Sequence, residues 1–442
     1  MLLTCDARQQ PVIEKGKMFM KIRNLISSAA AVSMVLLCGC SGGNAENMTE
    51  TSVQSVSEAV SEVPKDPHDE MVGRSLVSLG NDTRIRAKIA QMQSGEETTI
   101  AYIGGSITEG FNAGSEDCWA KLSYENIAER FGTGDNVRYV NAGLAGTPSV
   151  LGNLRLERDV LSHDADIVFI EFAVNDAQDI MHKASYEDMI RTILTRENEP
   201  AVILLFTVLE NGYTCQEHMS EIGSYYDLPM ISVGDAINPE FEAGCMVWDD
   251  YSNDQSHPHK EGHKLVAEFI SHYFDEEMSR SDVSEEYKMP PIFKYSQDYD
   301  NASMAEASTI GDTDGIELIG TGCFDPNVGT TVAGFKNGWK YSGSTEGGGL
   351  KFKVNANSLF IVYKQENSEN VGSIDIFRDG KRVYTINAND PDGWYNPVAE
   401  RVISNLDPMD MEIEIRMSEG SEDKDFEVLA IGFTQNEQFT YG

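Results

Sequence analysis

Residues 98–108 read TTIAYIGGSIT. Thr98–Ile103 is an apolar-rich run that predicts a buried strand, and Gly104 and Gly105 follow it at once. Glycines let the backbone turn sharply, which would lift the hydroxyl of Ser106 out of the sheet edge. A serine needs a base before it becomes a nucleophile, so its value as a site depends on what the rest of the chain supplies.

The chain around this stretch alternates between apolar strands and amphipathic helices. Further strands are predicted at residues 137–141, 166–172, 201–208 and 230–233. Helices are predicted at residues 118–131, 186–195, 214–226 and 260–279. Repeated strand–helix units indicate an α/β domain with a parallel sheet and helices on both faces, which we place at residues 75–280. Ligands of such sheets bind at the carboxyl ends of the strands.

The texture changes after about residue 285, where Gly, Asn, Asp and Ser punctuate short alternating segments. The predicted strands are residues 350–354, 359–363, 373–377, 382–386, 411–416 and 426–433. The tetrapeptide Arg378-Asp379-Gly380-Lys381 predicts a hairpin turn. We therefore expect an all-β sandwich domain, jelly-roll-like, over residues 285–442.

The N-terminal region carries targeting signals. Basic residues precede the uncharged apolar run Leu25–Leu37, which is too short to span a membrane and fits a signal peptide. The sequence Leu37-Cys38-Gly39-Cys40-Ser41 resembles a bacterial lipobox, which implies cleavage before Cys40 and lipidation of its sulfur. We expect residues 1–40 to be a lipoprotein signal peptide and residues 41–72 a disordered Ser-rich acidic tether, leaving the protein lipid-anchored outside the cell membrane.

The net charge and the cysteine content limit the classes of binding partner and cofactor. The net charge is −38, from 72 acidic and 34 basic residues, so nucleic acid and anionic lipid headgroups are disfavoured. Downstream of the signal region, four cysteines remain without a metal-binding spacing; they are Cys118, Cys215, Cys245 and Cys323. Buried free thiols are the simplest expectation, and no cofactor is implied.

Three more motifs follow predicted strands or precede the last helix. The segment Asn141–Thr147 contains Gly146, whose backbone N–H is a candidate oxyanion donor. The segment Glu171–Asp176 contains Asn175, whose amide is a second candidate, while Asp176 is expected to cap the following helix. In Asp254-Gln255-Ser256-His257-Pro258, the imidazole of His257 would take the proton of the serine, and Asp254 would hold its tautomer.

These blocks, in this order, resemble the SGNH (GDSL-like) hydrolase family over about residues 95–275. The matching residues are Ser106, Gly146, Asn175 and His257, with Asp254 in the Asp-x-x-His-Pro block. The resemblance implies a flavodoxin-like doubly wound sheet, a catalytic triad of Ser106, Asp254 and His257, and an oxyanion hole of Ser106, Gly146 and Asn175. The first block departs from many members, since Gly105 stands in place of Asp, and the third has Ala173 in place of Gly. Gly143 competes with Gly146, which the spacing favours.

Other residues have competing interpretations. His257, His259 and His263 form an H-x-H-x3-H run, yet no carboxylate or cysteine spacing supports a metal, and we assign none. Glu109 is close to Ser106 and receives no role. Five aromatic residues could line a sugar-binding surface or belong to the cores; they are Trp119, Trp248, Trp339, Trp394 and Tyr395.

Three functions remain open from the sequence. The first is an extracytoplasmic serine esterase that hydrolyses small acyl (acetyl) esters, by O-deacetylation of a polysaccharide. The second is a lipolytic esterase or lysophospholipase of the same family. The third is a noncatalytic surface carbohydrate-binding protein, against which the intact set of Ser106, Asp254 and His257 argues. The expected partners are an acylated carbohydrate or another small ester, and the membrane through the lipid anchor only.

Overall fold

The computed structural model describes residues 66–436, which fall within one compact unit. The predicted signal peptide, Cys40 and residues 41–65 of the predicted tether lie outside the described residues. Helix α1 (Pro67–Arg74) corrects the end of that tether, because Met71 and Val72 are buried in the core of the α/β domain. Only these two residues of the helix are buried in the core, and the rest of its sequence is mostly polar, which is why the sequence predicts a linker here.

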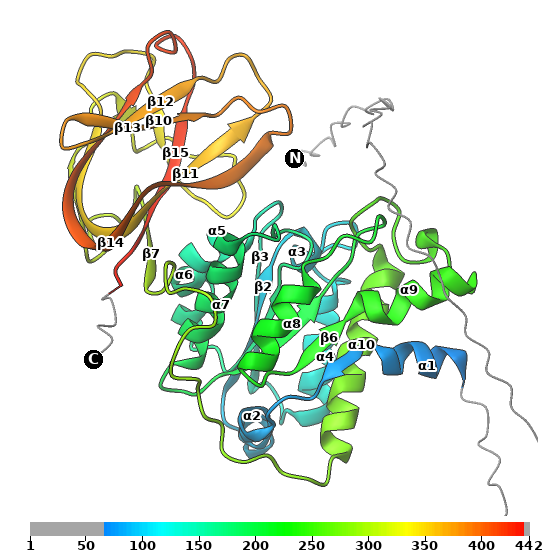
Figure 1. Ribbon diagram of the computed structural model, residues 1–442. Helices are drawn as coiled ribbons and strands as arrows, with labels where there is room; N and C mark the ends of the chain where they lie inside the picture. The colour runs from blue at the N-terminus through cyan, green and yellow to red at the C-terminus, as the bar shows by residue number, and fades with distance from the viewer. Residues whose placement is uncertain (1–65, 437–442) are drawn as a thin grey trace, which may run out of the picture. The chain divides into compact units, whose positions relative to one another are not determined.

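The α/β domain is built on a six-stranded sheet (Figure 1). Its strands are β1 (Leu76–Ser78), β2 (Thr98–Gly104), β3 (Val137–Gly143), β4 (Ile167–Glu171), β5 (Ala201–Phe206) and β6 (Met230–Ser232). Their order is β1-β6-β5-β4-β2-β3, and every pair except the antiparallel β1–β6 is parallel. The parallel strands have the flavodoxin-like order, so the predicted fold class is confirmed.

Helices cover both faces of this sheet. They are α2 (Thr83–Ser94), α3 (Ser106–Glu109), α4 (Trp119–Phe131), α5 (Ser149–Leu154), α6 (Leu156–Asp159), α7 (Ile180–Leu194), α8 (Gln216–Tyr225), α9 (Val233–Ala243) and α10 (Lys260–Ser279). Alternate residues of one strand enter separate cores, as Ile100 and Tyr102 do on one face and Ala101 and Ile103 on the other. Burial on both faces explains why the central strands are almost continuously apolar.

The C-terminal domain is all-β, as predicted. Its strands are β7 (Ala302–Glu306), β8 (Ile316–Gly320), β9 (Phe324–Asp325), β10 (Trp339–Tyr341), β11 (Leu350–Glu366), β12 (Ser373–Arg378), β13 (Lys381–Asn387), β14 (Trp394–Met417) and β15 (Glu427–Thr434). All of their pairings are antiparallel. The predicted hairpin joins β12 to β13, and Asp379 and Gly380 both have positive φ, as a type I′ turn requires.

The long strands β11 and β14 differ from the prediction of several short ones. Strand β11 runs through residues 350–366, although the sequence predicts two strands separated near residue 357. The pairing register of β11 with β14 shifts between Ala356 and Ser358, so the polar segment is a bulge within one strand.

A separate apolar cluster contains residues of both domains. Leu151 and Leu154 of α5 belong to it, together with Phe360 of β11 and Leu429 of β15. The side chain of Asn153 also donates a hydrogen bond of 3.0 Å to the carbonyl of Tyr299, just before β7. Helix α5 thus contributes its apolar side chains to a core shared with the all-β domain.

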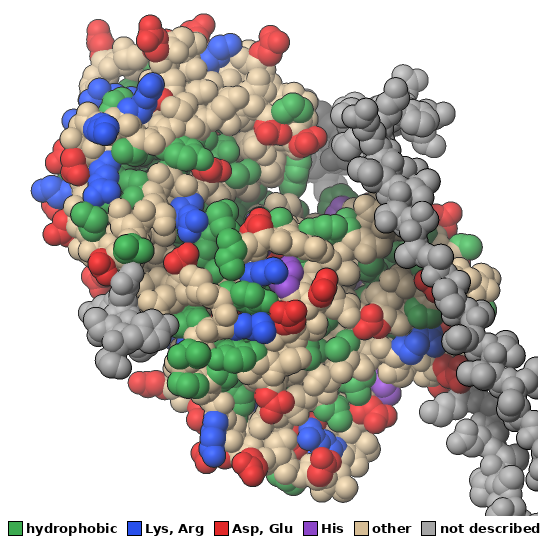
Figure 2. All heavy atoms as spheres, viewed as in Figure 1, with side chains coloured by type: hydrophobic (Ala, Val, Ile, Leu, Met, Phe, Trp, Pro, Cys, Tyr) green, Lys and Arg blue, Asp and Glu red, His purple; other side chains and the backbone are tan. Residues whose placement is uncertain are grey.

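The surface is strongly but diffusely charged. Figure 2 shows acidic and basic side chains interspersed over the visible face. The four described cysteines are free; Cys118, Cys215 and Cys323 are buried as expected, whereas Cys245 is exposed. Within residues 66–436, no helix is both long and apolar enough to cross a membrane.

Candidate active site

A serine, a histidine and an aspartate form a hydrogen-bonded chain at the carboxyl ends of the strands. The distance from Ser106 Oγ to His257 Nε2 is 2.9 Å, and that from His257 Nδ1 to Asp254 Oδ2 is 3.0 Å. Ser106 begins α3 directly after β2, while Asp254 and His257 lie in the loop before α10. The imidazole can therefore accept the serine proton while the carboxylate holds the opposite ring nitrogen.

The loop that carries Asp254 is tied together by its own polar groups. Asp254 Oδ1 accepts hydrogen bonds from the backbone N–H groups of Ser256 and His257, at 2.7 and 2.6 Å. Burial raises the pKa of Asp254, but these N–H groups and the His257 ring outweigh it and lower that pKa below its usual value. The carboxylate is thus kept ionised beside the imidazole.

Two further side chains support the same loop: Asn112, which was not considered from the sequence, and Trp248, for which only an aromatic surface or a core position was considered. The Asn112 side-chain amide donates to Asp254 Oδ2 at 3.0 Å and to the His257 carbonyl at 3.3 Å. The Trp248 indole N–H donates to the Asp254 carbonyl at 2.6 Å. Asn112 has a φ of 68°, a conformation that its sequence neighbourhood gave no reason to expect.

The strand ends beneath Ser106 are joined by a buried arginine. The guanidinium of Arg155 donates to the Ala142 carbonyl at 2.6 Å and to the Gly104 carbonyl at 3.1 Å. The strands β2 and β3 therefore end side by side, with fixed positions for the turns that follow. Gly143 belongs to this support, because a Cβ there would lie 2.1 Å from the backbone nitrogen of Glu109.

Both candidate oxyanion donors line the same cavity as Ser106. The cavity measures about 380 Å³, and its walls include Gly146, Asn175 and His257. Gly143, the competing glycine, is not among the residues that line it. The structure therefore brings Ser106, Gly146 and Asn175 to one place, where N–H groups can face the oxygen of a bound ester carbonyl.

A wall of this cavity comes from the all-β domain. Trp394 begins β14 and lines the cavity, and a Cβ at Gly146 would lie 2.6 Å from its ring. Gly146 has a φ of +70°, so both its conformation and this close ring favour glycine. Trp394 is 54% exposed, so the residue that lines this wall is also accessible to solvent.

The structure divides the other aromatic residues between the two interpretations, core position and exposed surface. Trp119 and Trp339 are fully buried in the cores, and Trp248 packs on Tyr251 beside the Asp254 loop. Trp394 and Tyr395 are exposed. Phe111 was not considered from the sequence, yet its ring centre lies 4.4 Å from that of His257.

Glu171 lies buried behind the serine turn. Its two carboxylate oxygens accept hydrogen bonds from the hydroxyls of Thr108 and Thr207, at 2.9 and 2.6 Å. Burial raises the pKa of Glu171, while these hydroxyls oppose that effect. The sequence does carry a signal for this group, namely one acidic residue at the end of an otherwise apolar strand. A carboxylate can be buried there only if hydrogen-bond donors surround it.

Asp176 corrects one expectation. Its Oδ1 accepts the backbone N–H of Ser149 at 2.7 Å, at the start of α5, whereas the cap of the following helix α7 is Asp179. Asp176 is fully buried, and burial raises its pKa to about 7. The sequence suggested a cap for α7 because that helix follows Asp176 in the chain, but the fold places Asp176 beside the start of α5.

The three histidines of the H-x-H-x3-H run have separate partners. His259 caps α10 by accepting from the backbone N–H of Gly262, and His263 Nδ1 accepts from that of Trp119 at 3.1 Å. Burial lowers the pKa of His263 to about 4, so its ring is neutral. No group of three or more metal-binding side chains occurs among residues 66–436.

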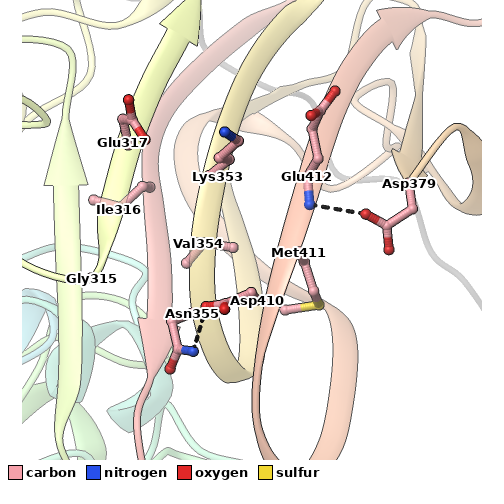
Figure 3. Close-up of a pocket in the computed structure, with 10 residues that line it drawn as sticks. All are labelled: Gly315, Ile316, Glu317, Lys353, Val354, Asn355, Asp379, Asp410, Met411 and Glu412. Atoms are coloured by element: carbon pink, nitrogen blue, oxygen red, sulfur yellow. Dashed lines mark hydrogen bonds between the residues drawn. The ribbon is translucent and has the colours of Figure 1, made fainter.

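A second cavity lies wholly in the all-β domain (Figure 3). It measures about 570 Å³ and is lined from β8, β11 and β14, together with the turn residue Asp379. Asn355 donates to Asp410 at 2.7 Å, and the backbone N–H of Glu412 donates to Asp379 at 3.2 Å. None of its lining residues is a serine, cysteine or histidine, so it offers no nucleophile–base pair comparable to Ser106 and His257.

The flavodoxin-like sheet and the Ser106–His257–Asp254 chain at its carboxyl edge define a serine ester hydrolase. Residues 102–265 match the model of the GDSL-like lipase/acylhydrolase family. No curated protein shows a significant match to the sequence.

Solved structures extend the likeness to both domains. A two-domain esterase (CEX) active on acetylated mannans is 26% identical, with a TM-score of 0.71 over 83% of this chain and 99% of that chain. Its structure co-crystallised with mannopentaose is 25% identical, with a TM-score of 0.70 and the same coverage. The likeness therefore includes the C-terminal all-β domain as well as the hydrolase domain.

Proposed function

We propose that this protein removes acetyl groups from an acetylated polysaccharide, with acetylated mannan as the first candidate. The observation that carries the proposal is the composition of the Ser106 cavity, which joins the nucleophile to an exposed indole from the second domain. The two-domain esterase with the same architecture acts on acetylated mannans.

In the proposed mechanism, Ser106 Oγ attacks the acetyl carbonyl while His257 Nε2 takes its proton. The negative oxygen of the tetrahedral intermediate receives hydrogen bonds from the N–H groups of Ser106 and Gly146 and from the Asn175 amide. His257 then returns the proton to the sugar hydroxyl that leaves. This leaves Ser106 acetylated. Water then attacks the acetyl-serine carbonyl while His257 takes its proton and returns it to Ser106 Oγ as the bond to the acetyl group breaks, which releases acetate; Asp254 stabilises the imidazolium in each step.

The size of the cavity favours a small acyl group. Its volume of about 380 Å³ is near the lower end of the range of about 300–1,000 Å³ usual for small-molecule sites. Part of this space must hold the alcohol side of the ester, next to Trp394. The apolar side chains Ile107, Val174 and Leu209 line the same cavity and suit the methyl of an acetyl group.

Trp394 supplies a surface for the sugar. Aromatic rings pack on the apolar faces of sugar rings, and an exposed Trp beside the nucleophile positions such a ring near the scissile ester. Tyr395, the next residue, is 55% exposed. The net charge of −38 agrees with a neutral glycan better than with anionic lipid, which disfavours the lipolytic alternative.

Acetate release from a panel of acetylated polysaccharides tests the substrate class. Wild-type protein without residues 1–40 should release acetate from acetylated mannan, and Ser106→Ala should release none. Aryl acetate should be hydrolysed faster than aryl octanoate. Faster hydrolysis of the octanoate, without acetate release from any polysaccharide, would support the lipolytic function instead.

We also propose that the enzyme works outside the cell on a lipid anchor at Cys40. The support is the sequence alone: a basic start, a short apolar run and the segment Leu37–Ser41. Labelling with a radioactive fatty acid in a bacterial host should mark wild-type protein and leave Cys40→Ala unlabelled. Equal labelling of both would exclude this anchor.

A further inference from the structure

The turn that carries Gly146 is held at both ends by carboxylates. The backbone N–H of Ala145, one residue before Gly146, donates to Glu109 Oε2 at 2.9 Å. The backbone N–H of Ser149 donates to Asp176 Oδ1 at 2.7 Å. The two acceptors come from different parts of the chain, and neither touches the Ser106–His257–Asp254 chain through a hydrogen bond described above.

Each carboxylate belongs to a segment that carries another oxyanion donor. Glu109 is the last residue of α3, the helix that Ser106 begins. Asp176 directly follows Asn175. The three segments that provide the N–H groups are thus linked in a row: the Ser106 helix to the Gly146 turn through Glu109, and the Gly146 turn to the Asn175 segment through Asp176.

We propose that Glu109 and Asp176 are positioning residues, which fix the Gly146 turn relative to Ser106 and Asn175 and so set the geometry of the oxyanion hole. The inference rests on the serine esterase activity and is independent of which polysaccharide is the substrate. An oxyanion hole is effective only when its donors are held in place before the charge develops.

The chemistry of both groups agrees with this role. Burial raises the pKa of Glu109, and burial raises that of Asp176 to about 7. Retaining two acidic groups in such surroundings costs stability, which is common where a group serves the reaction. Asp176 Oδ1 accepts the Ser149 N–H, while its second oxygen, Oδ2, is buried without a hydrogen-bond partner.

Paired variants of similar size separate the acceptor from the bulk of each side chain. Glu109→Gln and Asp176→Asn keep an oxygen that accepts the N–H, whereas Glu109→Met and Asp176→Leu remove it. With an aryl acetate, we expect the Met and Leu variants to lose about 100-fold in kcat, the usual cost of a displacement near 1 Å, with little change in KM. The Gln and Asn variants should retain kcat within a few-fold.

Asp188→Leu is the matched control. Asp188 is also buried, its Oδ2 accepts one backbone N–H, from Tyr299 at 2.7 Å, and its other oxygen has no partner. It belongs to α7 and lines no wall of the Ser106 cavity. This variant should lower the melting temperature as Asp176→Leu does, yet leave kcat unchanged at temperatures where it is folded.

A thionoester gives a readout specific to the oxyanion hole. Sulfur accepts hydrogen bonds weakly, so the wild-type enzyme should strongly prefer the oxygen ester, and the Met and Leu variants should lose much of this preference. A folded Glu109→Met variant with the wild-type kcat and the wild-type preference for the oxygen ester would overturn the proposal. Because Glu109 is only half-buried, this variant should fold even if Asp176→Leu does not. Absence of wild-type hydrolysis of the aryl acetate would instead contradict the esterase activity itself.

Discussion

The Asn175 carboxamide packs directly against the α-carbon of Gly105. A Cβ at position 105 would lie 2.3 Å from Asn175 Oδ1, a distance that no real Cβ contact permits. The absence of a side chain in the GGS variant of the motif is therefore coupled to the place of the amide beside Ser106. In this chain the space beside the Gly105 α-carbon is filled by the Asn175 carboxamide.

Gly105→Ala should accordingly displace Asn175 and lower kcat by about 100-fold, because a shifted donor loses most of its hydrogen bond to the oxyanion. Steady-state kinetics with an aryl acetate measure this. Gly114→Ala serves as a control on a nearby glycine, since a Cβ there meets nothing within 4 Å, although its φ of +87° strains the backbone. Unchanged kcat in Gly105→Ala would show that Asn175 does not donate in the reaction.

Removal of the triad carboxylate should cost less than removal of the nucleophile. Ser106→Ala should abolish detectable turnover, and Asp254→Asn should lower kcat by up to about 10⁴-fold through loss of the correct tautomer. Both variants should keep the wild-type circular dichroism spectrum. Residual turnover by Ser106→Ala at the wild-type rate would identify a different nucleophile.

Trp394→Ala should separate sugar binding from ester chemistry. The indole lines the Ser106 cavity but contacts none of the triad through a hydrogen bond described above. We expect KM for acetylated mannan to rise about two- to tenfold, since an aromatic contact of this kind contributes about 0.5–1.5 kcal/mol. The kcat/KM for a small aryl acetate should change much less. An equal loss on both substrates would place Trp394 in the support of Gly146 rather than in sugar binding.

The buried Asp176 should make stability fall between about pH 4 and pH 7. Its folded pKa of about 7 lies above the ordinary value of 3.8, so over this interval the unfolded chain releases a proton that the folded protein keeps. The free energy of unfolding must then decrease as pH rises, by a few kcal/mol at most, and level off above the folded pKa. Asp176→Asn mimics the protonated acid, so its stability relative to wild type should increase over the same interval. Urea unfolding at several pH values measures the difference, and a constant difference would contradict it.

Chelation should leave the activity unchanged. His257 pairs with Ser106 and Asp254, while His259 and His263 hold backbone groups at helix starts, so the three rings have separate tasks. Aryl acetate hydrolysis before and after treatment with EDTA is the measurement. Loss of activity that added zinc restores would revive a metal site in this loop.

The sequence predicts the α/β fold well because its periodicity is local. The strand Ile167–Glu171 is apolar up to its last residue, Glu171, and a turn that carries a motif residue follows it. Helix α9 was missed, since Pro239 lies inside it and the pattern reads as interrupted. The site residues were predicted through a set of short blocks in order, which requires no knowledge of distances.

The contacts that shape the site could not be predicted in this way. Trp394 and Gly146 are separated by most of the chain, and only folding brings the indole over the glycine. The partners of Glu109 and Asp176 are backbone N–H groups, which every residue has, so no sequence pattern marks them. The bulge near residue 357 likewise depends on pairing with β14 rather than on its own composition.

The location of Trp394 in β14 has a consequence for engineering this enzyme. The triad residues belong to the α/β domain, whereas Trp394, which would border the sugar under the proposed function, belongs to the all-β domain. Under the proposed function, exchanging the all-β domain between relatives should therefore alter which glycan is accepted while the reaction stays the same. A fragment that ends after α10 would lose Trp394 and would also expose Leu151 and Leu154 to solvent. A low activity of that fragment would therefore reflect damaged packing as much as lost sugar binding.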